Sequence, residues 1–188
     1  DIAIFFPKYF VFEIPYVLRD ADHFFKLWAG PVGKEINDVV LKERGVITAG
    51  VVYRGARYLT ANKVIRRPEE VKGLKIRLPE NKPWIKIWES LGALPVVVAF
   101  PEVYMALKTG VAEAQENPPE SIWAYKFYEA QKYLIATKHV YSACKYQISK
   151  KWFDRLTTDQ QKLILDAWKE ATDYANGLAK EADAKIVK

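Results

Sequence analysis

The sequence predicts a mixed α/β fold, and three observations support this prediction. From Gly73 to Pro118, segments with the two-residue alternation of a strand take turns with segments whose apolar residues recur at helical spacing. Half of the 188 residues are hydrophobic and 14% are aromatic, which is enough for one substantial core or two modest ones. The chain also carries a long helical pattern near its end. Alternating elements of this kind are typical of α/β architecture.

Composition and motif content argue against several classes of protein. No apolar run approaches the roughly 20 residues that a membrane-spanning helix needs, and the first residues do not form a signal-peptide pattern. We find no phosphate-binding loop, no dinucleotide-binding glycine motif, no nucleophile elbow and no zinc-protease motif. The two histidines offer few ligands for a metal or acid-base site. We therefore expect no metal, no cofactor and no catalytic residues.

The charged residues and the cysteine are expected to have ordinary roles. The formal net charge is +6, from 29 Lys and Arg against 23 Asp and Glu, which makes a basic nucleic-acid-binding module an alternative to consider. The basic residues are scattered, however, and the patch of Lys63, Arg66 and Arg67 is more consistent with a solvated surface. Cys144 has no partner for an internal disulfide, and we expect a small buried side chain there.

The first part of the chain alternates between extended and helical segments. Asp20 is a typical N-cap, Gly45 a typical stop after a basic last turn, and Pro68 suits a first helical position. In order, the expected elements are strands at 2–6 and 10–14, a helix after Asp20 that Gly30 and Pro31 interrupt, a second helix up to Gly45, strands at 46–53 and 58–60, and a one-turn helix in PEEVKG.

The second part continues the alternation. In order, we expect a strand ending near Leu78, a helix in KPWIKIWESLG, a strand in LPVVVAF, a helix in PEVYMALKTG, a strand in VAEAQEN, a helix in ESIWAYKFYEA, a strand in HVYSACKYQIS and a long final helix. Thr157 and Gln160 form the capping pair that begins this last helix. The strand near Leu78 places Leu74, Ile76 and Leu78 toward a core and Arg77 on the other face.

The same region carries the candidate functional residues. A guanidinium at the end of a strand can bind a carboxylate through two parallel hydrogen bonds, and Arg77 is placed to do so. Glu102 and Glu116 offer an alternative, because a pair of carboxylates could serve a hydrolase or lyase that acts on a small organic acid. We prefer the interpretation that Glu102 favours the positive end of its helix and that Glu116 holds Arg57 or Arg77 in place. His23 and His139 are interpreted as structural.

Four motifs, in this order, resemble the extracytoplasmic solute-binding protein of tripartite ATP-independent periplasmic (TRAP) transporters, specifically the DctP family. The motifs are GARYLTANKVIRRPEEVKGLKIRLPEN, LGALPVVVAFPEVYMALKTGVAEAQENP, KFYEAQKYLIATKHVYS and ISKKWFDRLTTDQQKLILDAWKEA. The segment PYVLRDADHFFKLWAGPVGKEI at 15–36 fits as well, so the resemblance runs over nearly the whole chain. The resemblance implies a two-lobed periplasmic-binding-protein-like fold with a long C-terminal hinge helix. Family members are longer, which implies that the front of the first lobe is missing here.

The resemblance also implies a division of the chain and a location. Residues 1–54 with 143–182 would be the remainder of the first lobe, residues 55–142 the second, ligand-clamping lobe, and residues 157–183 a helix spanning both. The protein would be periplasmic and would deliver its solute to the integral membrane subunits of the transporter without any reaction. The solute would be an organic acid, dicarboxylate-like, although sugar acids, keto acids and aromatic acids stay open. The oligomeric state is not implied.

The implied ligand-binding residues carry over one by one. Arg77, in GLKIR, would pair with the ligand carboxylate, and Arg57, in GARYLT, would support that contact. Asn117, in QENP, would bond to the same end of the ligand, Phe100 would pack beside it, and Glu116 would complete the site. The sequence departs from the family pattern at two further positions. Ala114 replaces a usual glycine, and Glu113 replaces a usual aspartate.

Overall fold

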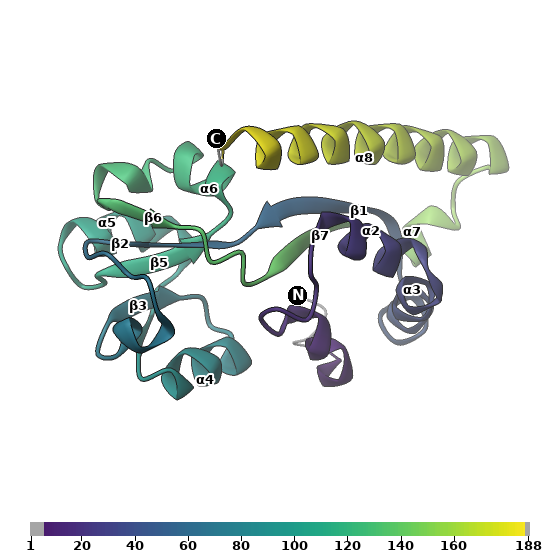
Figure 1. Ribbon diagram of the computed structural model, residues 1–188. Coiled ribbons are helices and arrows are strands. Elements are labelled where there is room, and N and C mark those ends of the chain that lie inside the picture. Colours follow the sequence, from purple (N-terminus) through teal and green to yellow (C-terminus); the bar gives the residue numbers. More distant parts are fainter. Residues whose placement is uncertain (1–5, 187–188) are drawn as a thin grey trace. The chain divides into compact units, whose positions relative to one another are not determined.

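A computed structural model describes residues 6–186, and these fold into two compact units (Figure 1). Unit 1 comprises Asp1–Phe10 and Ala56–Val140, and unit 2 comprises Val11–Gly55 and Tyr141–Lys188. The mixed α/β fold with a long C-terminal helix is confirmed. The assignment of lobes to residue ranges stays a prediction, as does a final helix that spans both lobes. The strand predicted at 2–6 lies outside the described residues, apart from Phe6.

Unit 1 is built on a five-stranded sheet with the order β4-β3-β5-β2-β6. Its strands are β2 (Tyr58–Ala61), β3 (Lys75–Leu78), β4 (Leu94–Val97), β5 (Ala114–Asn117) and β6 (Tyr133–Ile135). Strand β3 pairs in parallel with β4 and β5, whereas β2 pairs antiparallel with β5 and β6. The connections contain η2 (Pro68–Val71), α4 (Lys82–Ser90), η3 (Phe100–Glu102), α5 (Val103–Lys108), α6 (Pro119–Ala124) and η4 (Phe127–Glu129).

One face of this sheet carries the apolar core of unit 1. The predicted core residues Leu74, Ile76 and Leu78 are all buried there, together with Trp88 from α4. Helix α4 begins at the N-cap Asn81, whose side chain accepts a hydrogen bond from the backbone nitrogen of Trp84 at 3.2 Å. This cap fixes where the helix starts and so places its tryptophans against the sheet.

The opposite face of the sheet carries a row of buried polar side chains. Thr60 on β2 stands directly opposite Gln115 on β5, which stands directly opposite Arg77 on β3. Residues in register on neighbouring strands share a face. All three are almost fully buried, with exposures of 2%, 0% and 2%. Buried polar groups need hydrogen-bond partners, so this row marks the face where a functional site is expected.

Unit 2 contains a two-stranded sheet of β1 (Val46–Ala56) and β7 (Tyr141–Ser149). Its helices are α2 (Ala21–Ala29), α3 (Pro31–Arg44), α7 (Lys150–Phe153) and α8 (Thr158–Ile186). The predicted signals for their ends are confirmed. Asp20 accepts a hydrogen bond from the nitrogen of His23 at 2.7 Å, Gly45 has a φ of 62°, and Thr157 and Gln160 cap each other's backbone at 2.9 and 3.3 Å.

Helix α8 contacts β1 through the side chain of Asn176 and through a close approach between Thr172 and Gly50. The carboxamide of Asn176 accepts a hydrogen bond from the nitrogen of Tyr53 at 2.8 Å and donates one to the carbonyl of Val51 at 3.1 Å. Gly50 lies against Thr172, so close that a Cβ on the glycine would stand 2.1 Å from the threonine Oγ1. No helix of the described residues is long and apolar enough to cross a membrane.

Three predictions about local structure are wrong or incomplete. The strand predicted at 10–14 belongs to a 3-10 helix, η1 (Pro7–Glu13), because Pro7 suits a first turn better than a strand. The helix predicted in ESIWAYKFYEA divides into α6 and η4, since Lys126 takes a left-handed φ of 56° between them. Strand β6 lies in KYLI, a short segment that no prediction covered.

Cys144 is exposed, which contradicts the predicted buried side chain. The alternation of β7 explains the difference. Tyr141 and Ala143 pack against an apolar cluster around Phe24 and Tyr53, so the even-numbered residues of the strand face the other way. Cys144 therefore lies on the face that this cluster does not cover.

Candidate functional site

Arg77 is a buried cation with part of its hydrogen-bonding capacity unused. Its Nε donates to the backbone carbonyl of Val98 at 2.9 Å, and among residues 6–186 its two terminal nitrogens have no hydrogen-bond partner. Burial lowers the pKa of Arg77 to about 10, with Glu116 opposing and Arg57 adding to the effect. The guanidinium nevertheless stays charged at neutral pH, so two donors and a positive charge are available to an anion.

Phe100 lies beside this guanidinium. The Cζ atom of Arg77 is 5.7 Å from the centre of the Phe100 ring, within the range of a cation–π contact. Phe100 is half-buried in η3, and it packs edge-on against Tyr125 with ring centres 4.7 Å apart. The aromatic residue that the sequence predicted is therefore in contact with the predicted arginine.

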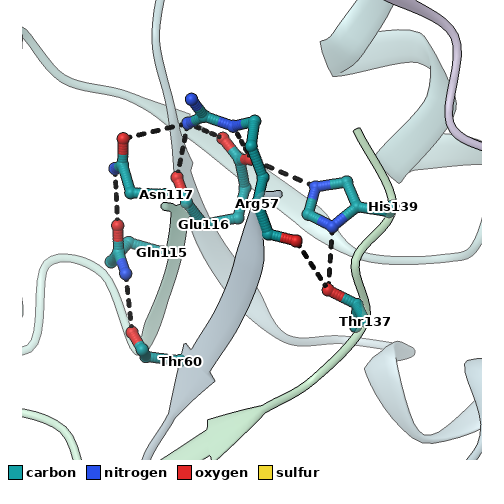
Figure 2. A network of polar contacts seen from close by, with 7 residues as sticks. All are labelled: Arg57, Thr60, Gln115, Glu116, Asn117, Thr137 and His139. Carbon is teal, nitrogen blue, oxygen red and sulfur yellow. Dashed lines mark hydrogen bonds and ion pairs between the residues drawn. The ribbon is translucent and has the colours of Figure 1, made fainter. Parts of the chain in front are cut away.

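Arg57 and Glu116 form a buried ion pair, shown in Figure 2. Nε of Arg57 donates to one carboxylate oxygen of Glu116, and Nη2 donates to the other at 2.8 Å. Nη2 also reaches the backbone carbonyl of Glu116 at 2.7 Å and the side-chain oxygen of Asn117 at 3.0 Å. The Trp84 ring lies over the guanidinium, with its centre 5.0 Å from Cζ. The expectation that Glu116 holds an arginine in place is confirmed for Arg57.

His139 holds the same carboxylate from the other side (Figure 2). Its Nε2 lies 3.1 Å from Glu116, its Nδ1 lies 2.8 Å from the hydroxyl of Thr137, and its ring meets Trp88 edge-on. Burial disfavours the charged carboxylate, but the charge of Arg57 and the hydrogen bond from His139 outweigh it and lower the pKa of Glu116 to about 2. Glu116 is therefore an ionised structural partner and a poor general base.

A chain of neutral polar groups continues from this ion pair. Asn117 donates to the side-chain oxygen of Gln115 at 2.7 Å, and Gln115 donates to the hydroxyl of Thr60 at 2.9 Å (Figure 2). These bonds fix the direction of both carboxamides, because each oxygen and nitrogen has a defined partner. The chain runs along the face of the sheet that also carries Arg77.

The predicted site residues fall into two contacting groups. Arg57, Glu116 and Asn117 form one, and Arg77 with Phe100 forms the other. Glu102, by contrast, is exposed at the start of α5, whereas Glu116 is buried. In the part of the chain that the structure describes, no group of three His, Cys, Asp or Glu residues is placed to hold a metal.

Sequence reasoning missed four residues of this network and understated a fifth. Gln115 could have been found, since it alternates with Asn117 on the same strand and must share its face. No sequence pattern pointed to Thr60 or Thr137 as members of the network, and the spacing of Trp84 indicated only the apolar face of a helix. His139 was interpreted as structural, which agrees with its bonds, but its partner Glu116 could not be read from the sequence.

A comparison with protein families matches residues 1–188 to the model described as DctP, bacterial extracellular solute-binding protein, family 7. Among curated relatives, the chain is 34% identical over 177 residues to the C4-dicarboxylate-binding periplasmic protein DctP of Rhodobacter capsulatus, which covers 94% of this chain and 53% of that protein. The chain spans about half the length of the curated relatives it matches.

Two solved structures illustrate the structural likeness. A sugar acid binding protein of Advenella mimigardefordensis in complex with galactonate matches with a TM-score of 0.92 and 30% identity, over 100% of this chain and 60% of that one. A TRAP periplasmic solute-binding protein of Shewanella oneidensis with bound succinate matches with a TM-score of 0.88 and 27% identity, over 94% of this chain and 57% of that one.

Proposed function

The chain belongs to the DctP family of bacterial extracellular solute-binding proteins, and from this premise we propose that the whole protein binds a carboxylate-bearing organic acid for a TRAP transporter. The family consists of solute-binding proteins, which confirms the expectation of a protein that binds rather than reacts. The periplasmic location expected from the resemblance is confirmed by the relatives. Delivery to the integral membrane subunits of the transporter is part of the proposal.

The observation that carries the proposal is the buried, incompletely bonded guanidinium of Arg77. A cation held away from water is unfavourable unless it is paired, so an anion that reaches it gains a strong charge-assisted bond. The two terminal nitrogens match the spacing of the two oxygens of a carboxylate. Solved relatives with bound galactonate and succinate, both carboxylates, support this chemistry.

The other predicted residues take supporting roles in the proposal. Phe100 covers one side of Arg77 and excludes water from the contact. Asn117 keeps an N–H group beyond the one it donates to Gln115, and this group can reach the same end of the ligand. Arg57 holds Asn117 in position through its Nη2, and Glu116 holds Arg57. The predicted hydrolase or lyase alternative is disfavoured, since both carboxylate oxygens of Glu116 are already engaged.

The first test is the affinity of the full-length protein for galactonate and succinate, measured by calorimetry before and after Arg77→Ala. Removing one partner of a buried, hydrogen-bonded charge pair costs about 2–5 kcal/mol, so we expect a loss of roughly 30-fold or more for any acid that binds. Arg66→Ala is the matched control, because Arg66 is an exposed arginine of the same unit. Unchanged affinity in Arg77→Ala would contradict the assignment of the site.

A further inference from the structure

We propose that Tyr125 is a further ligand-binding residue, whose ring packs against the carbon chain of the bound acid beyond its carboxylate. The inference rests on the proposed function and adds to it a residue that senses the length of the acid. Three features of Tyr125 carry it: its place at one edge of the sheet of unit 1, its contacts with Phe100 and Phe127, and the exposure of its ring.

The topology of the sheet brings Tyr125 to the edge where Arg77 lies. Strands β4 and β5 flank β3 and run parallel to it, so the carboxyl ends of all three meet at one edge. Arg77 lies next to the last residue of β3, and its Nε donates to the carbonyl of Val98, directly after β4. Phe100 follows in η3, and Tyr125 is the C-cap of α6, the helix after β5. Ligands of open α/β sheets bind outside this edge.

Ring contacts connect Tyr125 to the surroundings of Arg77. The centre of the Phe100 ring is 5.7 Å from Cζ of Arg77, and the Tyr125 ring meets Phe100 edge-on, with centres 4.7 Å apart and planes at 83°. Among residues 6–186, Arg77 makes its cation–π contact with Phe100 and none with Tyr125. The two rings therefore form a corner in which Phe100 lies nearer the guanidinium and Tyr125 lies farther from it.

The position of the Tyr125 ring is fixed by the backbone and by a buried neighbour. The N–H of Tyr125 donates to the carbonyl of Ser121 at 3.0 Å, and Lys126 then takes a left-handed φ of 56°. After this turn comes Phe127, which is 1% exposed and stacks on Tyr125 with ring centres 6.1 Å apart. Because the ring is already held between two others, a ligand that packs on it orders little that was free before.

The Tyr125 side chain nevertheless keeps a free surface. It is 53% exposed in spite of its contacts with Phe100 and Phe127. An aromatic face can cover the C–H groups of a ligand whose charge is bound elsewhere, here by Arg77. Phe100 then lies along the carbons next to the carboxylate and Tyr125 along the later ones. The contribution of Tyr125 to the affinity should therefore grow with the length of the carbon chain.

The decisive experiment compares acids that share a head group and differ by two carbons. D-galactonate with L-threonate is one pair, since both carry the same configuration at the two carbons next to the carboxylate. Adipate with succinate is the second pair. Affinities for the full-length protein are measured by calorimetry, with displacement titrations for weak binders, in wild type and in Tyr125→Ala.

Tyr125→Ala should weaken binding of the six-carbon acid about fivefold or more and change the four-carbon affinity by less than about twofold. Equal losses at both lengths would mean that Tyr125 only holds Phe100 beside Arg77, and they would overturn the inference, as would unchanged affinities. A wild type that binds four-carbon acids alone would also overturn it and leave the proposed function intact. If no acid of the panel binds, the proposed function fails together with the inference.

Two further variants separate the ring from its surroundings. Tyr125→Phe keeps the ring and should bind both acids of a pair nearly as wild type does. Tyr128→Ala is the matched control, because Tyr128 is a 45% exposed tyrosine of the adjoining η4 that stacks on Trp123 at 5.0 Å. It should leave both affinities unchanged, and a loss as large as that of Tyr125→Ala would overturn the inference. Urea denaturation completes the test, since a Tyr125→Ala protein that is less stable but keeps its ratio of affinities would assign the ring to packing alone.

Discussion

Glu116 is a buried, ionised group that acts on the proposed site through its neighbours. Its folded pKa of about 2 lies below the ordinary value of 4.5. A carboxyl with a lowered folded pKa stabilises the protein above the unfolded pKa, and this stabilisation is lost as the pH falls toward the folded pKa. The stabilisation from Glu116 should therefore be complete above about pH 5 and decline between pH 5 and pH 2, by roughly 3 kcal/mol in all.

This pH dependence can be measured by urea denaturation between pH 7 and pH 3. Wild type should lose stability on acidification, and Glu116→Gln should start lower, because Arg57 is left unpaired, and lose less. The difference between the two proteins should shrink as the pH falls. Glu120→Gln, at an exposed residue of α6, is the control and should follow wild type throughout. A constant difference across the range would show that Glu116 is not ionised in the folded protein.

Trp84 is expected to set the plane of the Arg57 guanidinium. The ring lies over Cζ at 5.0 Å, and such contacts contribute about 0.5–2 kcal/mol. Trp84→Ala should therefore weaken binding of a carboxylate such as galactonate about 2- to 30-fold, and Trp84→Phe should restore part of the loss. Trp123→Ala is the control, since that ring is 71% exposed. Calorimetry decides the point, and equal losses for Ala and Phe would refute a role for the aromatic face.

For single residues, the sequence motifs predicted which side chains belong to the site, but most of the contacts between these side chains could not be predicted. Arg57 and Glu116 are 59 residues apart in the chain, and they meet only because β2 and β5 pair in one particular register. The bond between Thr60 and Gln115 depends on the same register, whereas His139 reaches Glu116 from the segment between β6 and β7. A periodic pattern defines the face of a strand but does not determine which strand will lie beside it.

At the scale of single elements, the predictions succeeded where a residue has a local reason for its position. Asp20, Gly45 and the pair Thr157 and Gln160 end or begin helices by bonding to nearby backbone, so their effect can be read from the sequence. The segment 10–14 and Cys144 were misjudged. Proline in a first turn selects a 3-10 helix for the former, and packing on one face of β7 decides the exposure of the latter.

Gly50 offers a test of how α8 is fastened to β1. An alanine Cβ would stand 2.1 Å from Oγ1 of Thr172, so Gly50→Ala should lower the free energy of unfolding by about 1–3 kcal/mol. The same change in a Thr172→Ala background should cost much less, because the clashing atom is gone. A double-mutant cycle by urea denaturation measures this coupling.

Gly177→Ala is the control for that cycle. It lies on the same helix with nothing within 4 Å of the added Cβ, so it should stabilise the protein by about 0.5–1 kcal/mol. Equal costs of Gly50→Ala in both backgrounds would mean that the close approach of helix and strand does not limit this position.

For the whole molecule, the buried charge of Arg77 should lower the free energy of unfolding of the unliganded protein, and a bound anion should reverse this effect. Arg77 is buried with a pKa lowered to about 10, so its charged form is disfavoured in the folded state. Arg77→Met replaces the cation with an apolar side chain of similar length, and it should raise the free energy of unfolding by about 1–3 kcal/mol while abolishing binding.

Arg57→Met gives the opposite expectation for a residue of the same type. It leaves Glu116 buried without its main partner, which should destabilise the protein by about 3–5 kcal/mol. Urea denaturation with and without galactonate compares the two variants. If Arg77→Met destabilises the protein as much as Arg57→Met does, Arg77 is a structural residue and not an open ligand site.

The fold class and the family could be predicted for the molecule as a whole, because both rest on patterns repeated along the chain. Alternating elements and a long final helix gave the α/β fold, and motifs in order gave the DctP family. The choice of arginine that pairs with Glu116 could not be predicted, because the sequence left Arg57 and Arg77 as equal candidates.

The exposure of Cys144 provides a chemical handle. It is the one cysteine in the sequence, and its thiol is accessible on β7. Within these 188 residues a maleimide dye would therefore attach at one defined position, in unit 2, whereas Arg77 belongs to unit 1. The fluorescence of such a dye, measured while an acid is titrated, would report binding without a separate assay.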